Sequence, residues 1–312
     1  MNLKTLRDRL LLQEDLNFLL TNRVPRHVAT RLVGRLSRIR QPWIAALLIG
    51  VWRLFTELDL REAKQQRFAS LHECFIRELK AGVRPIEPDP AILCSPCDGI
   101  VGACGPVEGT QVFQAKGFPY SAVELFGSQA AAEPYRDGTF ITLRLTSAMY
   151  HRFHAPADCR IEHVRYLAGD TWNVNPIALK RIERLFCRNE RAVLQCRLDG
   201  DDSPPVAMVA VAAILVASIR LHCLDELLHI DYSGPTEHAC DARYRKGDEL
   251  GWFQHGSTVI VFAPRGFALA EGIGTGTRVR MGEALLRRAP TSVAATPSSG
   301  HSAVTADPEH RG

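Results

Sequence analysis

The first eighty residues of the chain place their hydrophobic side chains at the spacing of a helix. Between residues 28 and 39 apolar residues recur every three or four positions, and arginines occupy the adjoining face. A second segment, Trp43–Phe55, is apolar on most faces and has a tryptophan at each end of its charge-free part. The pattern predicts helices over residues 1–80, with Pro25 where a helix starts and Pro42 where it stops.

The segment Ser70–Glu73 has the form of a capping box, which predicts the start of a further helix. Prolines at positions 85, 88 and 90 then end the helical part and mark the expected domain boundary. The predicted buried face of this last helix consists of Leu71, Phe75, Ile76 and Leu79.

From about residue 91 the pattern changes to short runs of β-branched and aromatic residues between turn residues. We therefore expect an α+β protein with a helical, membrane-associating region at 1–85 and a β-rich, sandwich- or barrel-like domain at 86–288. Residues 289–312, rich in Pro, Ser, Thr and Ala, predict a disordered tail. The predicted strands include Phe140–Leu145, Val164–Leu167, Val206–Ile219, His229–Tyr232 and Val259–Phe262.

Charge is distributed unevenly along the chain. The 312 residues carry a net charge of +4, which is too small to indicate a nucleic-acid partner. Residues 1–40 alone hold nine Lys and Arg against three acidic residues, a net charge of +6. Each basic residue near an anionic membrane contributes ~1 kcal/mol of binding, so this arm suits a membrane surface. Burial in a helical subdomain is the alternative for these helices.

Membrane-spanning and metal-binding patterns are weak. The longest charge-free apolar runs, Trp43–Trp52 and Pro205–Ile219, fall short of the ~18–20 residues that a spanning helix needs. We expect no signal peptide, because the first thirty residues lack an apolar core followed by a cleavage site. Nine cysteines, an odd number, favour a reducing compartment. Cys94 and Cys97 form a pair without a second ligand pair, so we expect no metal.

Three separated segments carry candidate chemistry. They contribute Asp98 in a turn, His151 and His154 three positions apart, and Gly256–Ser257 directly before an apolar strand. An imidazole can remove the proton of a serine hydroxyl, and a carboxylate can fix the imidazole tautomer. The residues alone leave plain turns, structural histidines or half a metal site open as alternatives. The Gly-x-Ser-x-Gly elbow of many hydrolases is absent around Ser257.

Taken together and in order, these segments resemble the phosphatidylserine decarboxylase family. The resemblance runs from roughly residue 20 to 286 and is closest to the shorter, membrane-associated bacterial form. The matching segments are Ser95–Gly99, Gln114–Ser121, Phe140–Thr142, Tyr150–His154, Gly169–Asn175, Leu185–Arg191, Lys246–Phe253 and Gly256–Ile260.

The resemblance implies a role for each candidate residue. Asp98, His154 and Ser257 match the family's self-processing triad, and His151 matches the histidine of the decarboxylation chemistry. The implied cleavage site lies between Gly256 and Ser257, and Ser257 becomes a covalent pyruvoyl (pyruvate) cofactor. Chains 1–256 and 257–312 are then expected to stay associated. The residue at position 255 is His where the family usually has Leu, which we expect to affect the rate of processing.

The resemblance also implies a reaction and a place in the cell. The pyruvoyl group would form a Schiff base with the amine of phosphatidylserine in an anionic membrane, release CO₂ and yield phosphatidylethanolamine, which is carboxy-lyase chemistry. The family implies a homodimer, peripheral on the cytoplasmic side of a bacterial membrane. An unprocessed membrane-surface binding module with the same fold is the main alternative. A serine hydrolase or a metal site built on the histidines are the others.

Overall fold

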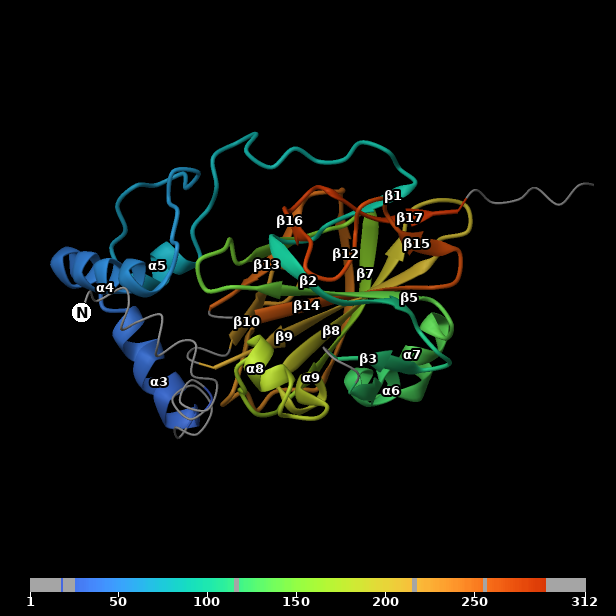
Figure 1. Ribbon diagram of the computed structural model, residues 1–312, viewed down its shortest axis with the longest axis horizontal. Coiled ribbons are helices and arrows are strands. Elements are labelled where there is room, and N and C mark those ends of the chain that lie inside the picture. The colour runs from blue at the N-terminus through green and yellow to red at the C-terminus, as the bar shows by residue number, and fades with distance from the viewer. Residues whose placement is uncertain (1–17, 19–25, 115–117, 215–217, 255–256, 290–312) are drawn as a thin grey trace, which may run out of the picture.

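The computed structural model describes residue 18 and residues 26–114, 118–214, 218–254 and 257–289. Within these residues the strands form four sheets, and three helices gather at one end of the molecule (Figure 1). The largest sheet has eight strands in the order β12-β7-β8-β9-β14-β5-β2-β16, and every neighbouring pair is antiparallel. Its end strands, β12 and β16, do not pair with each other in the described residues, so the expected barrel is not closed.

The middle of this sheet is fully enclosed. All residues of β14 are buried, and so are all but the first of β9. β9, and β14 from Val259 onward, are continuous apolar runs because each of their faces meets a hydrophobic core. The strands are β2 (Gly99–Pro106), β5 (Thr139–Leu145), β7 (Cys159–Leu167), β8 (Arg191–Leu198), β9 (Pro205–Ala212), β12 (Glu237–Tyr244), β14 (Ser257–Ala263) and β16 (Arg278–Val279).

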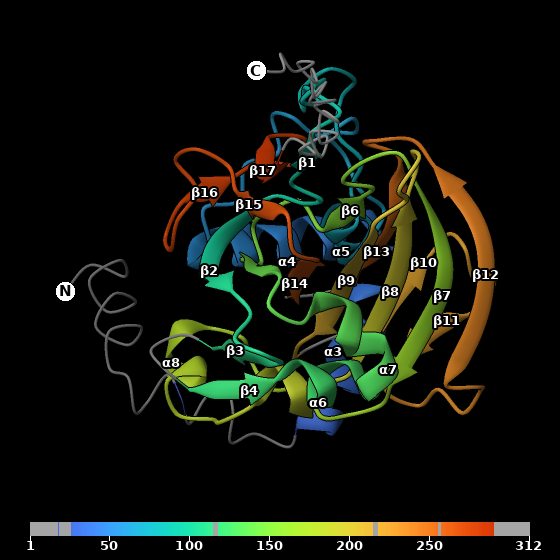
Figure 2. The ribbon, with the colours of Figure 1, turned by 90° about the vertical axis from the view of Figure 1, so that its right-hand side faces the viewer.

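Alternate residues of β14 point into two different cores. Val259 and Val261 pack in one core, together with strands of two smaller sheets. Ile260 and Phe262 pack in the other, together with short helices on the opposite face, a sandwich-like layering (Figure 2). The two smaller sheets that share the core of Val259 and Val261 are β11-β10-β13-β6 and β1-β17-β15. Their strands are, in these orders, Leu227–His229, Ser218–Leu221, Glu249–Phe253 and Arg152–His154, then Ile92–Cys94, Ala284–Arg288 and Phe267–Leu269. The opposite face carries β3 (Gln111–Phe113), β4 (Pro119–Ser121), α6 (Ala122–Phe126), α7 (Gln129–Ala132), a 3₁₀ turn (Glu133–Tyr135), α8 (Pro176–Leu179) and α9 (Leu185–Arg188).

The N-terminal helices are α3 (Arg26–Ser37), α4 (Pro42–Phe55) and α5 (Leu71–Phe75). Pro42 is the first residue of α4, so the prediction that it stops a helix is wrong: α3 already ends at Ser37. A proline is tolerated at this position because the first helical N–H has no partner in the helix. Residues 56–70 contain turns, bends and one isolated β-bridge but no helix, which shortens the predicted helical content.

The predicted capping box at α5 is confirmed. Ser70 Oγ accepts the backbone N–H of Glu73 at 3.1 Å, and the Glu73 carboxylate accepts the N–H of Ala69 at 3.0 Å. The helix nevertheless ends after Phe75, so the predicted apolar face reaching Leu79 is wrong. Leu79 instead forms a β-bridge with Ala63, which satisfies the backbone of this segment outside a helix.

Two predicted strands differ from the structure. Val206–Ile219 is not one strand: β9 ends at Ala212 in the large sheet, and β10 begins at Ser218 in the four-stranded sheet. His229–Tyr232 is not a strand, because β11 ends at His229 and the Tyr232 N–H turns back to the His229 carbonyl at 2.7 Å. Pro25 and residues 290–312 of the predicted tail lie outside the described residues.

Within the described residues, no helix combines the length and apolar character needed to cross a bilayer. The most apolar helix, α4, has 14 residues. At 1.5 Å per residue this is about 21 Å, against a hydrocarbon core of roughly 30 Å.

Candidate active site

Ser257 is the first residue of the central strand β14 and lies between two neighbouring strands. It faces Leu145 of β5 and Ala212 of β9, and it is 0 % exposed. Its Oγ has no hydrogen-bond partner among the described residues. A buried hydroxyl without a partner costs about 1–3 kcal/mol of stability. The preceding His255 and Gly256 lie outside the described residues.

His154 ends β6 and is held at both ring nitrogens. Nδ1 lies 2.9 Å from the carbonyl oxygen of Gly247, and Nε2 lies 3.0 Å from the hydroxyl of Tyr150. A carbonyl only accepts, so Nδ1 carries the proton of the neutral ring and Nε2 accepts the Tyr150 O–H. Burial lowers the pKa of His154, while the Gly247 carbonyl opposes that shift. The structure therefore presents a neutral imidazole whose lone pair is occupied by Tyr150.

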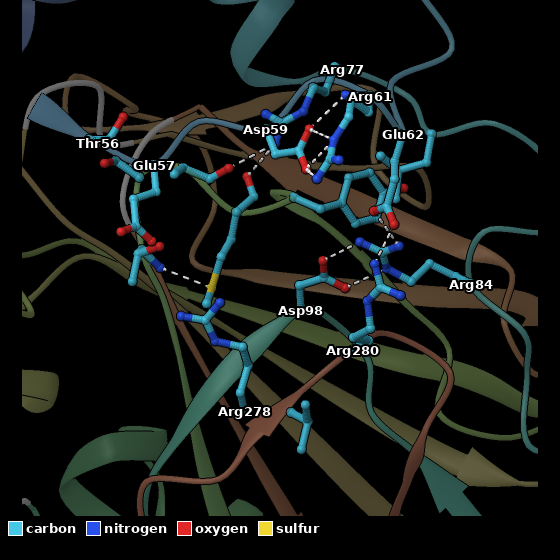
Figure 3. A pocket seen from close by; sticks show the side chains of 17 residues that line it. Thr56, Glu57, Asp59, Arg61, Glu62, Arg77, Arg84, Asp98, Arg278 and Arg280 are labelled. Atoms are coloured by element: carbon cyan, nitrogen blue, oxygen red, sulfur yellow. Dashed lines mark hydrogen bonds and ion pairs between the residues drawn. The ribbon is translucent and has the colours of Figure 1, made fainter. Parts of the chain in front are cut away.

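Asp98 lies in the turn between β1 and β2 and is paired with Arg84. The guanidinium donates to both carboxylate oxygens, at 2.8 and 2.6 Å (Figure 3). The Met281 N–H donates to Oδ1 at 2.9 Å. Among the described residues no hydrogen bond joins Asp98 to His154. Its negative charge still acts on that ring through space, because it opposes the effect of burial on the pKa of His154.

Two adjoining cavities connect these groups. One of about 520 Å³ is lined by Asp98, Arg84 and Tyr150, and one of about 380 Å³ is lined by Arg84, Tyr150 and His154. Tyr150 thus lies between the carboxylate and the imidazole. Burial raises the pKa of Tyr150, so its hydroxyl stays a hydrogen-bond donor at neutral pH.

His151 directly precedes β6, at the end of the strand opposite His154. It is fully buried, its Nδ1 is 2.8 Å from the carbonyl oxygen of Met149, and its ring centroid is 3.9 Å from that of Phe75. The N–H of Phe253, the last residue of β13, donates to the backbone carbonyl of His151 at 3.0 Å. His154 instead faces Glu249, the first residue of β13. At about 3.3 Å per residue the two histidines are about 10 Å apart along β6. His151 is the one beside the end of β13 that leads to Ser257.

The structure brings part of the predicted site together. Asp98 and His154 share a polar cluster, whereas Ser257 has no hydrogen bond to either of them among the described residues. Sequence reasoning missed Tyr150 and Arg84. Tyr150 precedes His154 by four positions in the same motif, which was a usable signal. Arg84 meets Asp98 only through the tertiary fold, so no local pattern marks it.

The structure gives no support to a metal site. The described residues contain no group of three or more His, Cys, Asp or Glu side chains placed to hold an ion. Cys94 and Cys97 are fully buried, and burial raises the pKa of Cys94 to about 11. A thiol in such surroundings is a poor nucleophile and a poor ligand.

Comparison with known proteins gives a consistent result. Residues 71–287 match the sequence profile of the phosphatidylserine decarboxylase family. A phosphatidylserine decarboxylase proenzyme of Vibrio cholerae is 37 % identical over 273 residues, which cover 83 % of this chain and 94 % of the relative. Those of Aliivibrio salmonicida and Pseudomonas aeruginosa are 35 % and 36 % identical, and the matches cover 83 % and 84 % of this chain and 93 % of each relative.

The β-rich fold, the polar cluster and these matches define a decarboxylase, that is, a carboxy-lyase. The chain belongs to the phosphatidylserine decarboxylase family, as the motifs of its sequence indicated.

Proposed function

We propose that this chain cuts itself between Gly256 and Ser257 and then converts phosphatidylserine to phosphatidylethanolamine. The observation that carries the proposal is the Ser257 hydroxyl, which is fully buried and unpartnered among the described residues at the start of the central strand. A serine consumed during maturation explains such a group better than a stabilising role does. The name of the relatives, proenzyme, supports the same interpretation.

The cleavage is an acyl shift followed by an elimination. Ser257 Oγ attacks the carbonyl carbon of Gly256, the C–N bond breaks, and the peptide becomes an ester with a free amine. Loss of the Ser257 Cα proton then breaks the Cβ–Oγ bond, which releases the Gly256 carboxylate and leaves dehydroalanine. Water replaces the nitrogen, ammonia leaves, and a pyruvoyl group remains at the new N-terminus.

We assign His154 the role of base in the first step. A neutral imidazole with a lowered pKa and a lone pair on Nε2 is the form that can accept a proton. Because Tyr150 occupies Nε2, the proton reaches the ring only when this hydroxyl moves away or relays it. Asp98, held by Arg84, supplies the negative charge that stabilises the imidazolium.

A pyruvoyl group supplies an electrophilic carbonyl that holds the substrate amine and accepts the electrons left by CO₂. Position 257 fits such a group, because it is dry and anchored in the middle of the large sheet. His151 lies at the end of β6 nearest this position, and its Nδ1 is fixed by the Met149 carbonyl. We therefore assign His151 Nε2 the delivery of a proton to the substrate carbon after CO₂ leaves.

We further propose that α3 and α4 bind the surface of an anionic membrane, as a peripheral anchor on the cytoplasmic side of a bacterial membrane. Large apolar side chains that are 60–68 % exposed line these helices, an unusual density for a surface facing only water. They are Val28, Leu32, Trp43, Leu47, Leu54 and Phe55. A homodimer is the assembly that we expect from the family.

The maturation is tested by the intact mass of the purified protein. The wild type should give two associated chains, 1–256 and 257–312, the second with a pyruvoyl N-terminus, and it should release CO₂ from phosphatidylserine. Ser257→Ala should give one uncut, inactive chain. A wild-type chain that stays full length with an unmodified serine would refute the proposal and favour the unprocessed surface module.

The membrane contact is tested by sedimentation with phosphatidylcholine vesicles with and without phosphatidylserine. The double variant Leu47→Gln, Leu54→Gln should bind at least roughly tenfold more weakly, because burying one leucine contributes about 1.5–3 kcal/mol. The matched variant Leu47→Met, Leu54→Met keeps the apolar surface and should bind like the wild type. Equal binding of both double variants would reject this anchor.

A further inference from the structure

A second cavity, of about 300 Å³, lies between α3 and the hairpin formed by β10 and β11. Its charged lining is Arg31 and Arg35 from the helix, Arg38 directly after it, and Asp231 from the turn after β11. Arg31 pairs with Asp231, and Arg38 donates to Oε1 of Gln254 at 2.7 Å. Within the part of the chain that the structure describes, the guanidinium of Arg35 has neither an ion-pair nor a hydrogen-bond partner. The cavity therefore carries excess positive charge.

Arg35 lies at the boundary between this cavity and the exposed apolar stripe of α3. Residues three or four apart are neighbours on a helix surface. Arg31, four residues before Arg35, is such a neighbour on the cavity side, and Leu32, three residues before it, is such a neighbour on the apolar side. Arg38 and Ile39 follow directly after the end of α3 at Ser37. Leu32 is 65 % exposed and Ile39 is 37 % exposed. A molecule lying along the apolar stripe would thus place a polar end group beside Arg35.

The cavity also adjoins the segment that leads to Ser257. Its lining includes Ser218, whose carbonyl oxygen accepts the N–H of Gln254 at 3.2 Å. Gln254 precedes Ser257 by three residues, which span at most about 10 Å of extended chain. A group bound near Arg35 and Arg38 is therefore close to the position where the reactive carbonyl is proposed to form.

The larger cavity beside Asp98 is a weaker candidate for an anion. Its buried arginine Arg84 is already paired with Asp98 and Glu62, and Arg280 is paired with Glu62 as well. Arg61 pairs with Asp59 on the rim of the same cavity (Figure 3). Carboxylates thus compete there for these three guanidinium groups, and Arg278 is a lining arginine without a carboxylate partner among the described residues.

We infer that the cavity under α3 binds the phosphodiester of the phosphatidylserine headgroup, with Arg35 as its principal contact. This inference rests on the proposed function. A guanidinium binds phosphate through charge-assisted, bidentate hydrogen bonds. Acyl chains along Leu32 and Ile39 place the phosphate beside Arg35. In the headgroup only a few covalent bonds separate the phosphate from the serine amine. That amine points toward the start of β14, where the reaction needs it.

The test compares Arg35→Gln with Arg40→Gln, which removes the same charge from the same region outside the cavity. Arg40 pairs with Glu73 on the surface. Each variant is purified as full-length protein, its cleavage is verified by mass, and CO₂ release is measured with phosphatidylserine in neutral-detergent micelles. Arg35→Gln should be cleaved normally and should raise KM by roughly tenfold to a hundredfold, the loss expected for a charged hydrogen bond. Arg40→Gln should keep the wild-type KM, and Arg35→Lys should recover part of the loss.

Competition experiments separate a headgroup site from a site for free phosphate. Soluble glycerophosphoserine should inhibit the wild type and should inhibit Arg35→Gln at least tenfold less strongly. Inorganic phosphate should compete poorly with both. If phosphate competes as well as glycerophosphoserine, or if Arg35→Gln and Arg40→Gln share one KM, the inference is overturned. If the wild type is itself uncut or releases no CO₂, the proposed function fails instead.

If Arg35→Gln is not cleaved, the inference is still tested by comparing inhibition of the wild type by glycerophosphoserine and by inorganic phosphate. Strong, selective inhibition by glycerophosphoserine together with a raised KM in Arg35→Lys supports the headgroup site. Equal inhibition by both anions, or an unchanged KM in Arg35→Lys, rejects it.

Discussion

Glu190 is a carboxyl group buried directly behind the strand that faces Ser257. It is 0 % exposed, and its two carboxyl oxygens have no hydrogen-bond partner among the described residues. Its backbone carbonyl accepts the N–H of Ala212, the residue opposite Ser257 on β9. The hydroxyl of the nearby Tyr166 donates to the His229 carbonyl at 2.9 Å. Burial raises the pKa of Glu190 from 4.5 to about 8, against an opposing effect of the Tyr166 hydroxyl, so the group is mostly protonated at neutral pH.

The raised pKa makes stability depend on pH in a predictable direction. The folded protein holds the Glu190 proton more tightly than the unfolded chain does, so this contribution is fully present below pH 4.5. It is lost as the pH rises through about 8. Each pKa unit corresponds to about 1.4 kcal/mol, so ionising the buried group costs about 5 kcal/mol of unfolding free energy. Glu190→Gln has the same shape and no charge, and should escape this loss.

Urea unfolding followed by circular dichroism measures the effect. The variants are compared in a Ser257→Ala background, where we expect each protein to be one chain. The unfolding free energy of Glu190→Gln relative to its parent should rise by about 1.4 kcal/mol per pH unit between pH 5 and 8 and then level off. Glu271→Gln, at an exposed position, is the matched control and should show a flat difference. A flat difference for Glu190→Gln as well would refute the buried, protonated carboxyl.

Two further substitutions test the polar cluster. Tyr150→Phe removes the hydroxyl that favours neutral His154, so the pH midpoint of self-cleavage should move upward and the cleavage rate should change up to roughly tenfold. Gel electrophoresis of samples incubated at several pH values measures both quantities. An unchanged pH profile would show that the Tyr150 hydroxyl has no effect on the protonation of His154. Arg84→Gln leaves the Asp98 carboxylate without its partner and should lower the unfolding free energy of the uncut protein by about 3–5 kcal/mol, as measured by urea unfolding. Arg61→Gln, which breaks an exposed pair, should change the unfolding free energy little. Similar unfolding curves for the two arginine variants would contradict this account.

The sequence was most informative where contacts are local. The capping box Ser70–Glu73 joins residues three apart, and the motif Tyr150–His154 joins two that hydrogen-bond across four positions. Val206–Ile219 was misjudged because the run is almost continuously apolar from β9 to the first two residues of β10. Where that run breaks depends on which of two sheets each half joins, and this choice is made by tertiary pairing.

The site shows the same limit. The resemblance identified Asp98 and His154, and the structure places them in one cluster, but it also shows that Arg84, not His154, holds the Asp98 carboxylate. That pairing joins a loop after the helical region to the turn before β2. No periodicity or spacing in the sequence marks such a contact, because the two residues meet only in the tertiary fold, where their mutual attraction offsets the loss of hydration of both charges.

The same loop and helices take part in shaping the surroundings of His151. The rings of Trp52 and Phe75 are stacked with centroids 5.6 Å apart, and Phe75 in turn packs against His151 at 3.9 Å. Arg77, two residues beyond Phe75, donates to the carbonyl oxygens of Ala148 and Met149, and Met149 in turn fixes His151 Nδ1. The orientation of this imidazole therefore depends on α4 and α5. If α4 lies in the headgroup layer, the packing of Trp52 against Phe75 connects the membrane-bound helix to His151. A shift of α4 at the membrane should then change the orientation of the His151 ring through the rings of Trp52 and Phe75.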